Sequence, residues 1–259
     1  MGVTVVTGSG SGIGAATRIR IESRGGTVIG IDLRGAEICA DLSTLDGRRV
    51  AVREVLDRCD GRIDGLAACA GLGPAPSPGP LIVSVNYFGA IALLDGLKDA
   101  LARGQDSAAV VVISNSATAV KDINKDLVSS CLVAVEAAGD EGSARWCAEG
   151  LDGTTAYVAS KRALGQAVRR RTQSFAEAGV RLNAVAPGAT LTPLLEESLE
   201  DDVIGPMIRG FPIPLGGFGR PEQIAAAIDF LLGPDASFCA GSVLFVDGGS
   251  DALIRPDSF

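Results

Sequence analysis

Short apolar runs rich in β-branched residues alternate along this chain with longer stretches of helical periodicity. The apolar runs have the character of buried strands and fall at residues 3–7, 27–32, 63–70, 108–114, 180–186 and 243–246. The stretches between them predict helices at residues 13–24, 47–59, 81–101, 155–178 and 221–232. Apolar strands that alternate with helices indicate a parallel sheet covered on both faces. The predicted fold class is therefore α/β, with a doubly wound parallel sheet.

Two longer segments interrupt this alternation. Within residues 119–153, which precede the helix at 155–178, we predict helices at residues 127–138 and 141–149. Residues 190–220 are rich in Pro and Gly and carry large apolar side chains: Leu194, Leu195, Ile204, Met207, Ile208, Phe211, Ile213 and Leu215. Long segments at the strand ends of such a sheet usually carry function or contacts. Because no change of composition marks a boundary, we predict one domain over residues 1–259 with an insertion at 119–153.

The composition is that of a folded protein that does not bind nucleic acid. Hydrophobic residues make up 47% of the 259 residues and charged residues 21%, which is ordinary for a globular domain. The net charge of −8 argues against a protein that binds a phosphate backbone, since such a protein needs clustered Lys and Arg.

The six cysteines include no C-x-x-C pair, and the chain has no histidine, so we predict no metal site. Reduced thiols in a cytoplasmic protein are the expected state. Residues 2–7 already read as a strand rather than a signal peptide, and no apolar run looks long enough to span a bilayer. We therefore expect no membrane partner.

The absence of histidine excludes a Ser-His-Asp triad, a Cys-His pair and an H-E-x-x-H zinc site. Tyr157 and Lys161 offer another way to move a proton. With two tyrosines and four lysines in the chain, their four-residue spacing is improbable by chance. On a helix the two side chains share a face, where an ammonium favours the phenolate and lowers the pKa of the tyrosine. The pair thus becomes a candidate general acid or base for an alcohol and its ketone.

A glycine-rich turn between the first strand and the first helix is a candidate phosphate site. Two registers fit the run from Thr7 to Ala15: Gly10-x-Gly12-x-x-Ala15, and the looser Gly8-x-x-x-Gly12-x-Gly14. Both place small residues where the backbone approaches a pyrophosphate, and both aim free helix N–H groups at the anion.

Asp32 strengthens the interpretation of the turn as a dinucleotide site. It ends the second strand, 18 residues after Gly14, where a carboxylate accepts hydrogen bonds from the adenosine ribose and repels a 2′-phosphate. Asp32 therefore favours NAD(H) over NADP(H), although Arg34 is a cation that could reach a phosphate. Asp41 either accepts a hydrogen bond from the adenine amino group or caps the following helix.

Ser114 is predicted to end the fourth apolar strand, at the edge where open α/β sheets bind their ligands. Its hydroxyl is placed to hold a substrate oxygen beside Tyr157. Ser116 is the rival, two residues further on, and we favour Ser114 because it ends the strand directly.

These features together resemble the short-chain dehydrogenase/reductase family over essentially the whole chain. The matching pieces are Thr7-Gly8-x-x-x-Gly12-Ile13-Gly14, Cys69-Ala70-Gly71, Val85-Asn86-Tyr87, Ser114, Tyr157-x-x-x-Lys161 and Pro187-Gly188. The resemblance implies a single Rossmann-type domain and a catalytic set of Ser114, Tyr157, Lys161 and Asn86. In it Asn86 would hold a water that links Lys161 to solvent. Cys69 stands where the family has Asn, which puts the usual hydrogen bonds of that turn in doubt.

The motifs and the resemblance together predict which residues contact the cofactor, NAD(H). These are Gly8, Ser11, Gly12, Ile13, Gly14, Asp32, Leu33, Asp41, Leu42, Cys69, Ala70, Gly71, Tyr157, Lys161, Pro187, Gly188, Thr190 and Thr192. Of these, Thr190 and Thr192 would contact the pyrophosphate or the carboxamide.

Within the family, the chain resembles a bacterial subgroup of 3α-hydroxysteroid dehydrogenases and carbonyl reductases. The resembling segments are residues 30–34, 69–74, 83–89, 186–190 and 255–259, together with the insertion at 119–153. The resemblance implies a homodimer or homotetramer without the family's usual helix-pair interface. The apolar substrate loop at 190–220 favours a steroid or another bulky hydrophobic carbonyl compound. A dehydrogenase of another cyclic alcohol, such as a terpenoid, and a non-catalytic NAD-binding sensor are the alternatives.

Overall fold

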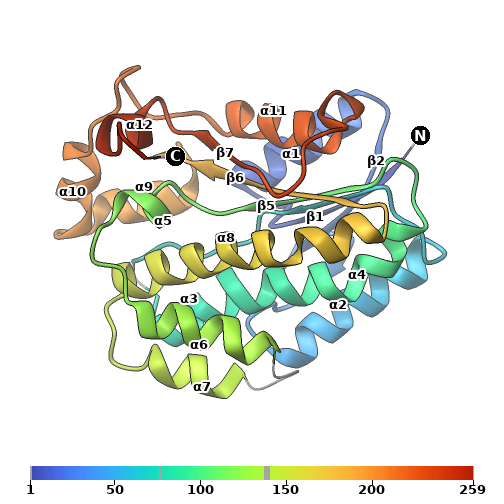
Figure 1. Ribbon diagram of the computed structural model, residues 1–259, viewed down its shortest axis with the longest axis horizontal. Helices are drawn as coiled ribbons and strands as arrows, with labels where there is room; N and C mark the ends of the chain where they lie inside the picture. Colours follow the sequence, from blue (N-terminus) through green and yellow to red (C-terminus); the bar gives the residue numbers. More distant parts are fainter. Residues whose placement is uncertain (1, 76, 137–140, 259) are drawn as a thin grey trace.

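The computed structural model describes residues 2–75, 77–136 and 141–258. Seven parallel strands of these residues form one sheet, in the order β3-β2-β1-β4-β5-β6-β7 (Figure 1). The strands are β1 (Val3–Thr7), β2 (Thr27–Asp32), β3 (Ile38–Cys39), β4 (Gly65–Ala68), β5 (Ala108–Val112), β6 (Arg181–Pro187) and β7 (Val243–Val246). The predicted doubly wound sheet is confirmed. The strand order reverses direction between β1 and β4, which is where such sheets bind nucleotides.

Helices cover both faces of the sheet. On one face lie α1 (Gly12–Ser23) and α11 (Pro221–Leu232), and on the other α2 (Leu45–Arg58), α4 (Ala90–Ala102) and α8 (Gly153–Glu177) (Figure 1). Val5 and Val6 are both fully buried, yet they belong to two different hydrophobic clusters, one on each side of the sheet. Successive strand residues point to opposite faces, so an unbroken apolar run is what a sheet buried on both sides requires.

Some predicted boundaries need correction. The strand predicted at 63–70 spans Gly65–Ala68, and the strand predicted at 108–114 ends at Val112, so Ser114 lies two residues beyond it. The sequence pattern also missed β3, which at two residues is too short to show a periodicity. The remaining predicted strands and helices agree with the structure to within one or two residues at each end.

The long helix predicted at 81–101 is one continuous helix, Gly79–Ala102, with a wide turn inside it. It consists of α3 (Gly79–Val83), the π-helical turn η1 (Ser84–Gly89) and α4. By length and composition alone this helix could cross a membrane, which corrects the expectation that no apolar run is long enough. However, 67% of its apolar window is buried inside the protein, where it packs on α2 and α8. We therefore identify it as a core helix.

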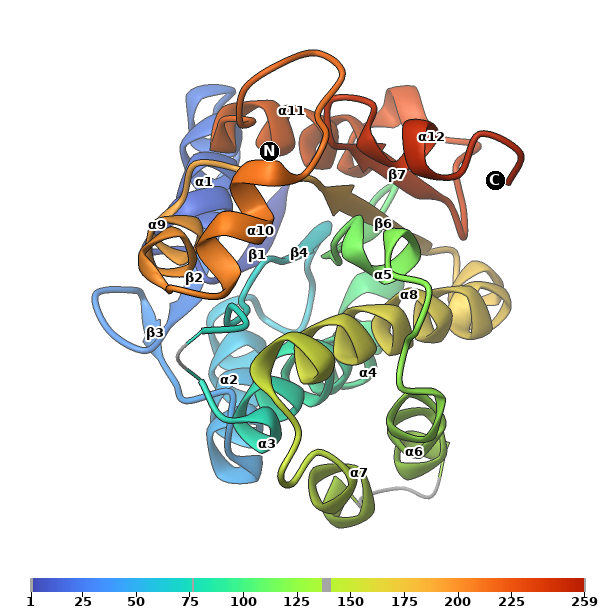
Figure 2. The same ribbon diagram turned by 90° about the vertical axis from the view of Figure 1, so that its left-hand side faces the viewer.

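The insertion adds a further layer outside the helices that cover the sheet. Its helices α6 (Lys125–Glu136) and α7 (Glu141–Cys147) pack on each other and on α8 and α3 (Figures 1 and 2). Leu127, Cys131 and Leu132 supply the buried face of α6. The two predicted helices are confirmed where the structure describes them, and the predicted end of the first, at Ala138, lies outside the described residues.

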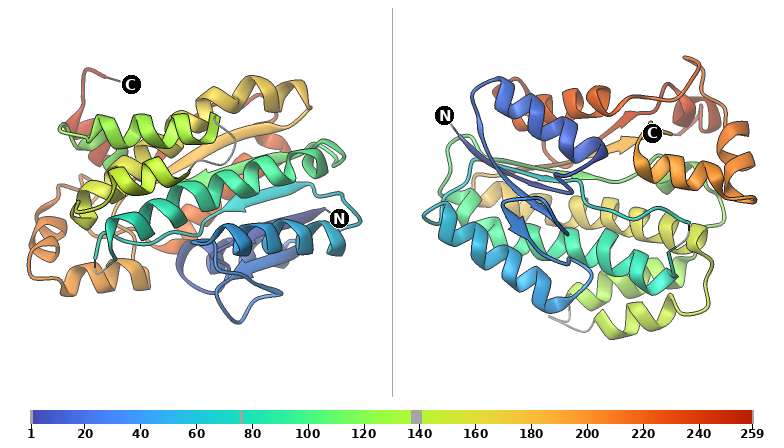
Figure 3. Two further views of the ribbon diagram at one scale, coloured as in Figure 1. Left: turned by 90° about the horizontal axis from the view of Figure 1, so that it is seen from below. Right: turned by 180° about the vertical axis from the view of Figure 1, so that it is seen from behind.

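Four of the remaining short helices come after the carboxyl ends of strands, and a 3₁₀ turn follows α11. They are α5 (Ser116–Ala119), α9 (Pro193–Glu200), α10 (Ile204–Gly210), the 3₁₀ turn η2 (Pro234–Ala236) and α12 (Ser250–Ile254). The pair α9–α10, drawn in orange, stands at one end of the sheet in both views of Figure 3. This pair is formed by the substrate loop, for which the sequence predicted apolar contacts but no helices.

Candidate active site

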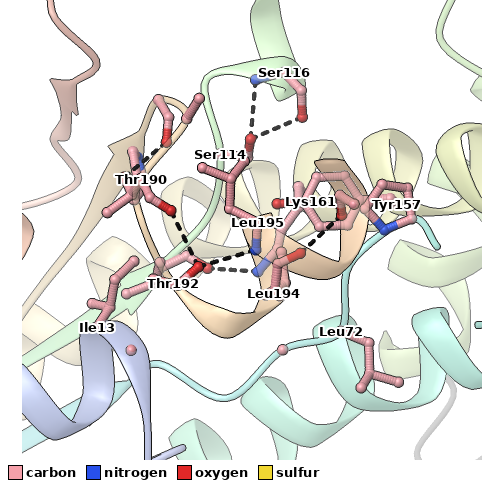
Figure 4. Close-up of a pocket in the computed structure, with 18 of the residues that line it drawn as sticks. Ile13, Leu72, Ser114, Ser116, Tyr157, Lys161, Thr190, Thr192, Leu194 and Leu195 are labelled. Atoms are coloured by element: carbon pink, nitrogen blue, oxygen red, sulfur yellow. Dashed lines mark hydrogen bonds between the residues drawn. The ribbon is translucent and has the colours of Figure 1, made fainter. Parts of the chain in front are cut away.

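A cavity of about 390 Å³ opens at the carboxyl ends of the strands. The glycine turn before α1, the ends of β4, β5 and β6, helix α8 and the pair α9–α10 all contribute to its wall. Figure 4 shows Ser114, Tyr157 and Lys161 near one another in this cavity, with Thr190 and Thr192 beside them. Most of the predicted catalytic and cofactor residues are therefore brought together in one space.

The glycine turn follows the register Gly8-x-x-x-Gly12-x-Gly14. Gly8 and Gly12 have left-handed φ angles of 66° and 51°. A Cβ on Gly14 would lie 2.0 Å from the carbonyl oxygen of Gly8, which no side chain can do. Gly10 meets neither constraint, since a Cβ there would approach only the Asp32 carboxylate, at 3.1 Å. The structure thus decides between the two registers and leaves α1 with its free N–H groups facing the cavity.

Asp32 lies beside the glycine turn, as predicted. One carboxylate oxygen accepts a hydrogen bond from Gly10 N at 2.9 Å and the other from Leu33 N at 2.7 Å. Arg34 follows on an exposed loop.

Asp41 and Leu42 lie at the end of β3. Asp41 does not cap the following helix, because the Thr44 hydroxyl accepts the hydrogen bond from Gly47 N that caps α2. Asp41 instead accepts from Ser43 N. Its predicted contact with adenine stays a prediction. The side chain of Leu42 is buried, so any contact it makes with a cofactor would use its backbone.

The Cys69-Ala70-Gly71 turn borders the cavity. Ala70 N donates to the hydroxyl of Thr7 at 3.0 Å, so this turn is tied directly to the strand that precedes the glycine turn. Burial raises the pKa of the Cys69 thiol to about 12, with Thr17 and Lys161 opposing the shift. A thiol with so high a pKa stays protonated and is a poor nucleophile.

Ser114 is buried and its hydroxyl is oriented by Ser116. Its Oγ accepts hydrogen bonds from Ser116 Oγ at 2.9 Å and from Ser116 N at 3.2 Å (Figure 4). With both acceptor positions used in this way, the hydroxyl hydrogen of Ser114 is left to donate toward Tyr157 or a substrate oxygen. The geometry favours Ser114 as the residue that holds the substrate and gives Ser116 a supporting position.

Tyr157 and Lys161 lie one turn apart on α8, and the Lys161 Nζ is 5.9 Å from the centre of the Tyr157 ring. Burial raises the pKa of Tyr157, and an interaction with the Ser114 hydroxyl only partly offsets this. The predicted lowering of the Tyr157 pKa by Lys161 is therefore wrong for this arrangement. Desolvation of the buried phenolate is the largest cause of the raised pKa.

Lys161 is 4% exposed, and its Nζ donates to the carbonyl oxygen of Val112 at 2.9 Å. Burial lowers the pKa of Lys161 to about 8. A Cβ on Gly71 would lie 3.3 Å from Nζ and 3.2 Å from Asn86 Oδ1, so glycine in the turn after β4 leaves room for both side chains.

Asn86 lies in the π-helical turn η1 and is fully buried. Its Oδ1 accepts from Leu72 N at 2.7 Å, and its Nδ2 donates to Leu72 O at 3.0 Å. The side chain thus holds the loop after β4 against the core helix. The predicted water link from Asn86 to Lys161 stays a prediction.

The segment after β6 carries Pro187, Gly188, Thr190 and Thr192 to the cavity wall. Thr190 Oγ1 donates to Gly188 O at 2.9 Å, and Thr192 Oγ1 accepts from Leu195 N at 3.2 Å as the N-cap of α9. The same threonines that were predicted to contact the cofactor therefore also fix the start of the α9–α10 pair.

Two carboxylates near the end of the chain hold the segment that follows Ser114. Asn115 Nδ2 donates to Asp247 Oδ2 at 3.3 Å, and Thr118 Oγ1 donates to Asp251 Oδ1 at 2.6 Å. Burial alone would raise the pKa of Asp251, but hydrogen bonds from Arg255 and Thr118 hold it below its ordinary value. No sequence pattern predicts these contacts, which join residues more than 130 positions apart.

The part of the cavity beyond the catalytic residues is apolar. Helix α10 turns one face toward it, made of side chains three or four residues apart: Ile204, Met207, Ile208 and Phe211. Of the apolar residues noted in the substrate loop, Ile213 and Leu215 lie instead next to Gly248. Among the wall residues that the sequence did not identify are Leu72, Pro74, Val120 and Thr154. Of these, Thr154 could have been found, since it stands one helical turn before Tyr157.

Proteins similar to this chain are named dehydrogenases and reductases. Residues 143–251 match the family described as enoyl-(acyl carrier protein) reductase. The chain is 45% identical to the 3-alpha-hydroxysteroid dehydrogenase/carbonyl reductase of Comamonas testosteroni, over 100% of both chains. It is 33% identical to the cis-4-hydroxycyclohexanecarboxylate dehydrogenase of Sinomonas cyclohexanicum, over 97% of each. The solved 3-alpha-hydroxysteroid dehydrogenase of Pseudomonas sp. B-0831, complexed with NADH, has a TM-score of 0.94 at 49% identity, over 99% of this chain and 100% of that one.

Proposed function

The chain belongs to the short-chain dehydrogenase/reductase family, and we propose that it transfers a hydride between NAD(H) and a secondary alcohol or ketone on a bulky hydrophobic substrate such as a hydroxysteroid. The observation that carries this proposal is the meeting of Ser114, Tyr157 and Lys161 between a glycine turn and an apolar chamber. The chemistry needs one wall for the cofactor and one for the substrate, with the proton-transfer group between them.

The residues present fit NAD(H). Gly8, Gly12 and Gly14 leave a cradle that side chains would fill, and the N-terminus of α1 faces it. Asp32 presents a carboxylate at the end of β2, where it would receive the adenosine ribose. When bound, NAD(H) supplies or accepts the hydride.

Tyr157 exchanges the proton in this proposal. Since burial raises the pKa of Tyr157, the phenol keeps its proton near neutral pH, which is the form that reduction of a ketone requires. The phenol O–H bond breaks, and its proton goes to the carbonyl oxygen as the hydride arrives at the carbonyl carbon. Ser114, whose hydroxyl hydrogen is free to donate, holds the same oxygen in place. Oxidation of the alcohol runs the proton transfer backwards and is expected to favour higher pH.

Lys161 has two parts in the mechanism. Its ammonium supplies positive charge beside Tyr157 and has donors left to hold a nicotinamide ribose, since only one bond goes to Val112 O. Because its pKa is about 8, Lys161 also exchanges its proton close to working pH and can return a proton to Tyr157.

Ser114 and Ser116 can be told apart by replacing each with alanine. We expect Ser114→Ala to lower kcat by about 10²-fold or more, because the donor to the substrate oxygen is lost. We expect Ser116→Ala to lower kcat by about tenfold or less, because it removes only one of the groups that orient Ser114. Steady-state NADH oxidation with a ketone substrate measures both. A larger loss in Ser116→Ala than in Ser114→Ala would reverse the assignment.

The apolar chamber supports a hydrophobic substrate. Side chains of α9, α10 and the loop after β4 line it, and relatives are named for hydroxysteroids and for cyclic alcohols. Turnover with NAD and a panel of hydroxysteroids, terpenoid alcohols and small cyclic alcohols tests the substrate class. No steroid turnover beside robust turnover of small cyclic alcohols would favour the alternative, a dehydrogenase of small cyclic substrates like that of the Sinomonas relative.

Truncation of the chamber should affect large substrates most. Phe211→Ala removes a large apolar side chain from the wall, so we expect the KM for a hydroxysteroid to rise about tenfold. The KM for a small cyclic alcohol should stay within about twofold, since it does not reach that far. Leu215→Ala is the matched control, because Leu215 is 86% exposed and lies outside the chamber wall. Equal effects of Phe211→Ala on both substrates would contradict the proposal.

We also propose that the protein is a homodimer or homotetramer, and its cytoplasmic location stays a prediction. The support is that the last part of the chain exposes several large apolar side chains: Phe230 on α11, Phe238 after η2, Leu244 on β7 and Leu253 on α12. The strand β7 is a sheet edge, and apolar edges are ordinarily covered. Light scattering is expected to give a dimer or tetramer, and Phe230→Glu with Phe238→Glu to give a smaller species. A monomeric wild-type protein at micromolar concentration would contradict this.

A further inference from the structure

An ion pair lies next to the proposed ribose site, on a part of the fold that the catalytic residues do not use. Arg18 of α1 donates to both carboxylate oxygens of Glu37, with distances of 2.9 Å from Nη1 and 2.6 Å from Nη2. The Arg18 Nε also donates to Glu22 at 3.0 Å. Hydrogen bonds and charge from Arg18, led by the bond to its guanidinium, hold the pKa of Glu37 below its ordinary value. The arginine is thus committed to two carboxylates.

Gly30 places this ion pair on the same face of β2 as Asp32. A Cβ on Gly30 would lie 2.7 Å from Glu37 Oε2 and 3.0 Å from Arg18 Nη1, so the ion pair occupies the space that a side chain at this position would need. Asp32 is two residues further along the strand. Side chains two residues apart point to the same face and are about 7 Å apart. The guanidinium of Arg18 is therefore within one side-chain rearrangement of the carboxylate that would receive the ribose.

Glu37 has a place in the sheet as well as in the ion pair. Its Oε2 accepts a hydrogen bond from Gly30 N at 2.9 Å. The short strand β3 pairs with β2 only at Ile31 and Asp32, so the Glu37 side chain serves the N–H group that β3 does not reach. The position of Glu37 is therefore fixed from two sides.

In dinucleotide sites an arginine near the end of the second strand is the usual partner of a 2′-phosphate, while an acidic residue there binds the free ribose hydroxyl. This chain carries the acidic residue, Asp32, and two arginines near it: Arg34 on the exposed loop that follows the strand, and Arg18 of α1, which Glu37 occupies. Charge-assisted hydrogen bonds between arginine and carboxylate are strong and directional, so Arg18 gains little by leaving Glu37 for a phosphate that must also approach Asp32.

We propose that Glu37 is a coenzyme-specificity residue that excludes NADP(H) by holding Arg18 away from the 2′-phosphate. Discrimination between NAD(H) and NADP(H) then depends on two carboxylates with different roles. Asp32 repels the 2′-phosphate, and Glu37 withholds Arg18, a cation that would compensate for that repulsion. The inference rests on the proposed NAD(H) function of the glycine turn and Asp32, and it concerns binding alone.

The test measures binding by titration calorimetry rather than turnover. The ligands are NADH, NADPH, 5′-AMP and 2′,5′-ADP, the last two differing by the 2′-phosphate alone. The central variant is Glu37→Gln, because its amide oxygen can still accept from Gly30 N while its charge is lost. Glu22→Gln is the matched control, since it removes the other carboxylate on Arg18 but leaves the Glu37 pair. Glu37→Ala is a second variant in case Glu37→Gln does not fold, because it too releases Arg18 from this carboxylate and the same gain in NADPH binding is expected.

For Glu37→Gln we expect NADPH and 2′,5′-ADP to bind about tenfold more tightly or better, which is the ordinary strength of an arginine–phosphate hydrogen bond. NADH and 5′-AMP should change by less than about threefold, as should all four ligands in Glu22→Gln. The gain should grow when combined with Asp32→Asn and vanish when combined with Arg18→Ala. It should persist with Arg34→Ala, which removes the exposed arginine of the neighbouring loop.

Unchanged NADPH binding in Glu37→Gln, with and without Asp32→Asn, would overturn the inference. A gain that survives Arg18→Ala would overturn it too. If the wild-type protein bound neither NADH nor 5′-AMP, the proposed function itself would fail, and that result is distinct from a failure of the Glu37 proposal.

Discussion

Replacing Tyr157 with phenylalanine is expected to lower kcat by about 10³-fold for ketone reduction, within the range that general acid catalysis supplies. The change removes one oxygen atom and with it the proton that the substrate oxygen needs. Among the described residues that line the cavity, Lys161 is the other cation near this position, and it lies 5.9 Å from the Tyr157 ring with a hydrogen bond to Val112 O. Binding of NADH should change by less than about threefold, because the glycine turn and Asp32 are untouched.

The chain offers a matched control for this experiment. Tyr87 is the other tyrosine, and its hydroxyl is buried without a hydrogen-bond partner among the described residues. Tyr87→Phe therefore removes the same atom from the core and should leave kcat within about twofold. Single-turnover NADH oxidation, followed by absorbance, compares the two variants with the wild-type protein. A Tyr157→Phe enzyme that retained more than about a tenth of the wild-type rate would contradict the assigned role.

Lys161→Met is expected to lower kcat by about 10²-fold or more and to change how stability depends on pH. Burial lowers the pKa of Lys161 to about 8, against 10.5 for an unfolded lysine. Between these two pH values the unfolded chain binds one more proton at this residue than the folded protein does. Stability therefore rises with pH across that window, by about 3 kcal/mol in total, and this contribution is absent from Lys161→Met. Below pH 8 the buried ammonium is a cost to folding.

Denaturant unfolding of both proteins at several pH values between 7.5 and 10.5 measures this effect. The free energy of unfolding of the wild-type protein should rise relative to that of Lys161→Met as the pH rises. Loss of the hydrogen bond to Val112 O adds a difference between the two proteins that does not change with pH. Lys121→Met, at an exposed position, should show no such trend. A difference that is constant with pH, or that falls as the pH rises, would show that Lys161 is not desolvated in the folded protein.

The fold was largely predictable because its strands are buried on both faces. Such strands appear in the sequence as unbroken apolar runs, and six of the seven described strands were found in this way. The missing one, β3, has two residues and no pattern to detect. The pair α9–α10 was missed for another reason. Proline and glycine around these short helices make the segment look like a loop, and the helices are stabilised by packing on each other rather than by their own sequences.

The features of the site that depend on short spacings in the sequence were predictable. Those that depend on burial, or on contacts between residues far apart in the sequence, were not. The four-residue spacing of Tyr157 and Lys161 placed both on one face, and the glycine positions located the turn. The direction of the Tyr157 pKa was wrong because it depends on desolvation, which a sequence does not reveal. The contact of Thr118 with Asp251 and the ion pair of Arg18 with Glu37 join separate elements, so they needed the folded structure.

The most direct test of hydride transfer at this site is to follow the hydrogen itself. NADH that carries deuterium at both hydrogens of nicotinamide C4 and a ketosteroid are incubated with the wild-type protein, and the product alcohol is analysed by mass spectrometry. We expect one deuterium per product molecule, on the carbon that carries the new hydroxyl, with one deuterium lost from each NADH consumed and no product from Tyr157→Phe on the same timescale. A reduced product without deuterium on that carbon, or unchanged NADH with every ketone of the panel, would contradict it.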